Sequence, residues 1–188
     1  MYEIKSKSLI RDAYKDLVTR LSLDERRTIY HLTVVYQDRT CFEKTRNQNK
    51  DYCISSIFSK FYMSRLLPYI MNTQNYTRVS FCDLQPITIV FPEKHKERFT
   101  YHHHAIICAT KETIERLDVI CDKELIDLFP FRNIQSMRLT KRDIRVIDYA
   151  SKEYSKLNDD VLIFSSKERV KDTNIGETKW YKDTTITW

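Results

Sequence analysis

Residues 86 to 110, PITIVFPEKHKERFTYHHHAIICAT, contain two strand-like runs joined by a polar segment, and they determine the class of fold that we expect. The runs Pro86 to Phe91 and Phe99 to Thr110 are rich in β-branched and aromatic residues, as strands are. The segment PEKHKER between them is polar and contains a proline, as hairpin connections often do. This pattern predicts two central antiparallel strands.

Helical and strand-like segments flank this hairpin on both sides. Four segments have apolar residues at the spacing of an amphipathic helix: 6–23, 52 to Pro68, 111–128 and 141–157. Two more have the composition of strands, 28–37 and 134–140, and the short run VLIFSS at 161–166 is either one more strand or a short packed apolar segment. Because a hairpin joins the middle strands, this order predicts an α+β domain in which helices pack on a central antiparallel sheet.

The composition predicts a single domain, and its charge fits either a polyanionic partner or an ordinary, mildly basic soluble protein. The chain has 188 residues, 41% of them hydrophobic, which is enough for one core, and it contains no repeat. We therefore expect one domain over residues 1–188, with its core at about 28–157 and a polar tail from about Lys167. Lys and Arg number 32 against 26 Asp and Glu, and the net charge of +6 favours a polyanion such as nucleic acid.

The sequence lacks three kinds of motif, and this restricts the possible functions and the cellular compartment. The single glycine, Gly176, excludes glycine-rich nucleotide loops, so phosphate would have to be bound by a metal ion or by Lys and Arg. The five scattered cysteines form no CxxC pair, which is typical of free thiols in a reducing cytoplasm. The N-terminal residues lack the apolar core of a signal peptide, and no long apolar span follows. We expect a cytoplasmic protein without membrane association.

Three consecutive histidines in the second strand of the hairpin are candidate metal ligands. Side chains of a strand alternate between its faces, so His102 and His104 share one face and His103 points the other way. Hairpin pairing could bring the carboxylate of Glu93 towards the same face, with Glu97, deeper in the turn, as the competing choice. Two imidazoles and a carboxylate leave positions open for a substrate oxygen and suit Mn²⁺ or Mg²⁺. The alternative is a solvated strand that binds no ion.

The stretch DYASKEYSK, from Asp148 to Lys156, contains a candidate nucleophile. A helix would place Tyr149 and Lys152 on one face, three residues apart. An unperturbed tyrosine has a pKa of about 10, so a phenolate nucleophile needs a positive neighbour. Attack of that oxygen on a phosphodiester would leave a covalent phosphotyrosine. The alternative is that the pair belongs to an ordinary half-buried helix surface.

Together and in this order, these motifs resemble the HUH endonucleases, metal-dependent tyrosine nucleases that initiate rolling-circle replication. HLTVVY, with Thr33, is similar to the family's first strand motif, HHHAII to its His-hydrophobic-His motif, and VIDYASK to its tyrosine motif. The resemblance covers about Thr28 to Leu157. It implies a sheet of the ferredoxin-like or RRM-like kind.

The resemblance also implies a role for each site residue. The metal ligands would be His102 and His104 with Glu93 as the acidic third ligand, Tyr149 the nucleophile, and Lys152 its assistant. The implied activity is site-specific nicking and joining of single-stranded DNA through a covalent 5′-phosphotyrosine. The implied substrate is single-stranded or hairpin origin DNA. The resemblance is also compatible with a host helicase and the host replication machinery as partners. Four basic residues near the site in sequence either contact phosphates or belong to an ordinary solvated basic face: Arg132, Arg138, Lys141 and Arg142.

The sequence departs from the family pattern in two places. His103 stands where a bulky apolar residue is usual. If the strand were shifted by one residue, His103 would face the metal site in place of His102 and His104. Tyr154 lies five residues after Tyr149, whereas paired catalytic tyrosines are four apart, which favours a single-tyrosine enzyme with Tyr154 in a packing role. Two other readings stay open: a DNA-binding module without catalysis, and a transposase, relaxase or RNA-processing enzyme with the same site.

Overall fold

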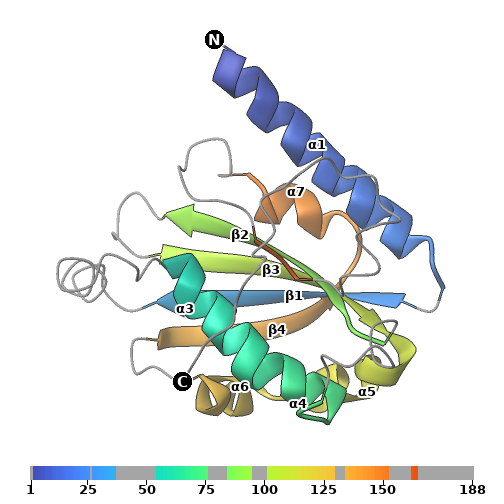
Figure 1. The fold of residues 1–188 in the computed structure, drawn as a ribbon, viewed down its shortest axis with the longest axis vertical. Helices are drawn as coiled ribbons and strands as arrows, with labels where there is room; N and C mark the ends of the chain where they lie inside the picture. The colour runs from blue at the N-terminus through green and yellow to red at the C-terminus, as the bar shows by residue number, and fades with distance from the viewer. Residues whose placement is uncertain are drawn as a thin grey trace.

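A computed structural model of the chain shows a five-stranded antiparallel sheet with helices packed on it (Figure 1). The structure describes residues 2–25, 27–36, 54–75, 84–94, 101–129, 134–152 and 162–164. The strands are β1 (Arg27–Tyr36), β2 (Ile87–Lys94), β3 (Tyr101–Thr110), β4 (Ile134–Arg142) and β5 (Leu162–Phe164). They lie in the order β4-β1-β3-β2-β5, and each neighbouring pair is antiparallel. The predicted α+β class and its central antiparallel sheet are confirmed.

One face of the sheet carries the larger core. It is covered by α3 (Ile54–Phe61), the π-helical turn η1 (Tyr62–Leu66), α4 (Leu67–Met71), α5 (Lys111–Val119) and α6 (Asp122–Leu128). Every second residue of β1 from Tyr30 to Tyr36 is buried in this core, as the period of a strand requires. This core therefore holds the sheet against the helices on that face.

Among the described residues, α1 (Tyr2–Ser22) and α7 (Val146–Ala150), which lie together on one side of the sheet in Figure 1, cover part of the opposite face. Its smaller core consists of α1 residues such as Leu17 and Val18, the α7 residues Val146 and Ile147, and the strand residues beneath them, such as Ile106. Farther along the same face, burial decreases. The side chains of Thr33, Val35 and His102 are only partly buried, and those of Ser136 and Arg138 are exposed.

The hairpin of β2 and β3 is longer than the composition predicts. β2 continues past Phe91 through Pro92 and Glu93 to Lys94, so these three residues belong to the sheet and not to the connection. Pro92 pairs in register with His103. The extension matters for function because it places Glu93 directly opposite His102.

The prediction that Pro68 ends the second helix is wrong. Pro68 lies in the first turn of α4, where its missing N–H costs no helical hydrogen bond. The turn before it is π-helical, and the N–H of Leu67 bonds to the carbonyl of Tyr62, five residues earlier. The helical path continues to Met71 and ends at Asn72, whose φ of 52° lies in the left-handed region that asparagine tolerates.

The helix predicted over residues 111–128 is two helices, α5 and α6. Ile120 and Cys121 both have extended backbone, with ψ of 125° and 164°. The N–H of Cys121 donates to the Glu124 carboxylate at 2.9 Å, which is half of a capping box and begins the second helix. Helical periodicity does not reveal this break because the apolar spacing continues across it.

The helix predicted over residues 141–157 begins only at Val146 and ends at Ala150, so Lys152 lies in the turn after it. Lys141 and Arg142 extend β4, and Asp143 then reverses the chain by accepting a hydrogen bond from the N–H of Arg145 at 3.0 Å. Several predictions lie outside the described residues: those on Glu97, Arg132 and Tyr154, and on the tail from Lys167. No helix among the described residues is both long and apolar enough to cross a membrane.

Candidate functional site

The three histidines of β3 divide between the two faces of the sheet. His102 and His104 lie on the partly covered face, and their ring centroids are 6.3 Å apart. His103 is completely buried in the larger core, where Nδ1 shares a 2.7 Å hydrogen bond with the hydroxyl of Tyr36. Burial, reinforced by the charges of His104 and His102, lowers the pKa of His103 to about 3. His103 is therefore a neutral core residue, and the register places His102 and His104 together.

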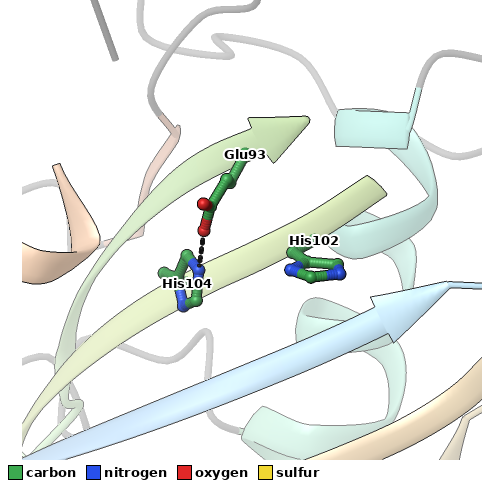
Figure 2. Close-up of side chains that lie close together, drawn as sticks. All are labelled: Glu93, His102 and His104. Carbon is green, nitrogen blue, oxygen red and sulfur yellow. Dashed lines mark hydrogen bonds and ion pairs between the residues drawn. The ribbon is translucent and has the colours of Figure 1, made fainter. Parts of the chain in front are cut away.

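Glu93 completes a group of three side chains that could hold a metal ion (Figure 2). It extends from β2 towards His104, whose Nε2 donates a hydrogen bond to Oε2 of the carboxylate. The ligand atoms of Glu93, His102 and His104 all lie within 4.8 Å of one another. Imidazole nitrogens and a carboxylate oxygen are ordinary ligands of a divalent cation, so the donor set fits such an ion.

The electrostatics of Glu93 favour a cation. Hydrogen bonding from His104 is the main cause that lowers the pKa of Glu93 to about 2, and a hydrogen bond and the positive charge from Lys152 act in the same direction against the effect of burial. The Lys152 ammonium lies 3.1 Å from Oε1 of Glu93. Near neutral pH this carboxylate is ionised, which is the state that ligates a metal.

Tyr149 and Lys152 lie over the same group. Val146, Ile147 and Ala150 of α7 are buried against the sheet, which leaves Tyr149 on the outer side with 51% of its surface exposed. Its ring centroid is 5.2 Å from that of His104. Lys152, in the turn after α7, places its ammonium 4.3 Å from the centre of the Tyr149 ring, a cation–π distance.

The docking of α7 determines where Tyr149 lies. An ion pair between Lys15 of α1 and Asp148 joins the two helices beside Tyr149. The Ser151 hydroxyl donates to the carbonyl of Ile147 at 2.7 Å and helps to end the helix. The structure therefore brings Glu93, His102, His104, Tyr149 and Lys152 together from two strands and the segment after β4.

Sequence reasoning missed His31. This residue lies on β1, and its Nε2 is 3.1 Å from Nδ1 of His104. Burial, followed by the charges of His104 and Arg142, lowers the pKa of His31 to about 4. The available signal was its position two residues before Thr33, on the same face of a predicted strand, but only the strand register shows which histidine it meets.

Basic side chains border the open part of this face. Across the sheet, Arg138 of β4 pairs with Thr33, which in turn pairs with His104. Arg142 pairs with Ile29 and so lies on the same face, whereas Lys141 pairs with the core residue Tyr30 and lies on the other. Of the basic residues singled out from the sequence, Arg138 and Arg142 therefore border the site, and Lys141 does not.

Comparison of the chain with protein-family models, with curated proteins and with solved structures found no match. A proposal about function therefore depends on the residues and distances of the site itself.

Proposed function

We propose that this protein is a metal-dependent tyrosine nuclease of the HUH type, which nicks and rejoins single-stranded DNA and initiates rolling-circle replication. The observation that carries the proposal is the 5.2 Å contact between the rings of Tyr149 and His104, because His104 also belongs to the Glu/His/His group. A candidate nucleophile thus lies beside a candidate metal site. The proposed substrate is single-stranded or hairpin origin DNA.

The donor set supports Mn²⁺ or Mg²⁺ as the ion. Glu93, His102 and His104 would hold it and leave positions open for water and a phosphate oxygen. When bound, the ion supplies Lewis-acid polarisation of the scissile phosphate.

Tyr149 is the proposed nucleophile. Its Oη forms a bond to phosphorus as the bond to the 3′ oxygen breaks, so the tyrosine keeps the 5′ phosphate and the 3′ oxygen leaves as a hydroxyl after taking up a proton. The phenolic proton leaves to solvent, which the half-exposed side chain contacts. Attack of a 3′-hydroxyl on the phosphotyrosine reverses these bond changes, so joining needs no nucleotide.

Lys152 is the proposed assistant of Tyr149. Its ammonium lies over the tyrosine ring and near Glu93, so it places positive charge between the nucleophile and the carboxylate. A phenolate that develops during attack is stabilised by this charge.

The open face offers a path for the DNA strand. In the part of the chain that the structure describes, α1 and α7 cover the face as far as the site, and the exposed side chains of Ser136 and Arg138 lie beyond it on β4. With Arg142 on the same face, these residues can contact backbone phosphates next to the proposed metal site.

The decisive experiment is an adduct assay with purified protein, labelled pools of single-stranded and hairpin DNA, and Mn²⁺. We expect a covalent protein–DNA band on a denaturing gel that disappears with EDTA and in Tyr149→Phe. Tyr69→Phe, which removes a hydroxyl from the helices on the other side of the sheet, is the matched control and retains the band. Tight DNA binding by folded protein without an adduct on any pool would refute the nuclease and favour a DNA-binding module.

A further inference from the structure

His31 is buried beside the proposed metal site, directly behind one of its ligands. Only 6% of its surface is exposed, and in the sheet it lies between Ile106 of β3 and Thr140 of β4. Its ring stacks on that of His104 with centroids 5.2 Å apart and planes 23° apart. The Nε2 atom of His31 is 3.1 Å from Nδ1 of His104, which is hydrogen-bonding distance.

The two ring nitrogens of His104 have different environments. Nε2 faces the Glu93 carboxylate and therefore the metal side, whereas Nδ1 faces β1. An imidazole that binds a metal through Nε2 keeps its proton on Nδ1, and that N–H needs an acceptor to hold the ring in place. Two atoms of β1 are within reach: Nε2 of His31 at 3.1 Å and the hydroxyl of Thr33 at 3.5 Å. The histidine is the better placed of the two.

His31 can act as that acceptor because its Nε2 lies at hydrogen-bonding distance from Nδ1 of His104 and its side chain is buried. A neutral imidazole with its proton on Nδ1 presents a bare Nε2 to His104. His31 also packs edge-on against Tyr149, with ring centroids 5.9 Å apart and planes at 82°. One side chain therefore contacts both a proposed ligand and the proposed nucleophile.

We infer that His31 is a positioning residue of the metal site: it accepts the Nδ1–H of His104 and so fixes the tautomer and orientation in which His104 presents Nε2 to the ion. The inference rests on the metal site of the proposed function and assigns that site a supporting residue from a third strand. It requires no DNA chemistry, so it can be tested separately from the nuclease activity.

The first test measures Mn²⁺ affinity by calorimetry in the whole protein. We expect His31→Phe, which keeps a buried aromatic ring but removes the acceptor, to weaken Mn²⁺ binding by about 10- to 100-fold. His31→Gln, which restores a carbonyl acceptor, should recover part of the loss, and Thr33→Val should have a much smaller effect. Ile106→Val is the matched control, because it disturbs packing beside His31 without removing a polar atom, and its affinity should equal that of wild type.

The outcomes distinguish a failure of the metal site from a failure of the inference about His31. If wild type binds Mn²⁺ and His102→Ala abolishes the binding, the metal site stands whatever the DNA assay shows. If His31→Phe, shown to be folded by its urea unfolding curve, then binds Mn²⁺ as tightly as wild type, the inference about His31 is overturned alone. If wild type does not bind Mn²⁺ at these ligands, the metal site and the role of His31 fail together.

A second test avoids substitution and so does not depend on the variants folding. Nitrogen-15 NMR of the histidine rings in wild-type protein loaded with Mg²⁺ reports which nitrogen carries each proton. We expect the proton of His104 on Nδ1 and that of His31 also on Nδ1, with Nε2 of His31 unprotonated. A loaded protein in which Nδ1 of His104 carries no proton, or Nε2 of His31 carries one, would overturn the inference.

Discussion

Replacing either of two adjacent histidines should have opposite consequences, because His103 and His104 point to opposite faces of β3. His103 is wholly buried, shares one hydrogen bond with Tyr36, and has an Nε2 without a partner among the described residues. His104 lies in the Glu/His/His group. We therefore expect His103→Leu to leave metal binding intact and His104→Leu to abolish it.

The size of each effect follows from these contacts. His103→Leu removes one hydrogen bond, worth about 0.5–1.5 kcal/mol, and also removes a buried nitrogen whose lack of a partner costs about 1–3 kcal/mol. The two terms oppose each other and together range from a loss of about 0.5 kcal/mol to a gain of about 2.5 kcal/mol, so the free energy of unfolding should change by less than about 3 kcal/mol. Mn²⁺ at 100 times its dissociation constant stabilises the folded protein by about 2.7 kcal/mol. For a chain of this length that corresponds to a rise in Tm of roughly 5–10 °C.

Thermal unfolding with and without Mn²⁺ measures both effects. Wild type and His103→Leu should show the rise in Tm, and His104→Leu should show none. Loss of the rise in His103→Leu with retention in His104→Leu would mean that the strand register is shifted by one residue. Absence of any rise in wild type at saturating Mn²⁺ would refute the metal site.

Two further predictions concern the core and the open face. Burial, with a 2.6 Å hydrogen bond that the hydroxyl donates to Asp118, raises the pKa of Tyr30, so the folded state holds the proton more tightly than the unfolded state. The stabilisation is complete below pH 10 and is lost as pH rises above it. By pH 11, the free energy of unfolding measured in urea should fall by about 1 kcal/mol more in wild type than in Tyr30→Phe. Equal losses in the two proteins would contradict this account. For single-stranded DNA, Arg138→Ala should reduce the slope of log affinity against log salt concentration by about 0.7. Lys111→Ala, on α5, is the control and should leave the slope unchanged. Equal slopes for wild type and both variants would show that Arg138 does not contact the DNA.

Local patterns were sufficient for the elements of the sheet but less so for the helix boundaries. Alternation and β-branched composition predicted β1, β2 and β3 because strands are short and each of their residues reports a face. The break at Cys121 and the start of α7 at Val146 each depend on one hydrogen bond from a backbone N–H to a side-chain carboxylate, from Cys121 to Glu124 and from Arg145 to Asp143. Apolar periodicity does not record such bonds.

Strand periodicity fixes which side chains share a face: it puts His102 and His104 together and His103 apart. Helical spacing predicted Lys152 near Tyr149, but α7 ends at Ala150, and it is the turn after the helix that brings the two side chains together. These relations are local, so they follow from backbone geometry alone.

How the elements meet depends on tertiary packing. The contact of Tyr149 with His104 depends on α7 burying Val146 and Ile147 against the sheet, and the contact of His31 with His104 depends on the register of β1 against β3. Both contacts depend on which apolar faces are buried against one another. These faces come from elements far apart in the sequence, so no single stretch of residues specifies the contacts. The candidate site is assembled at that level.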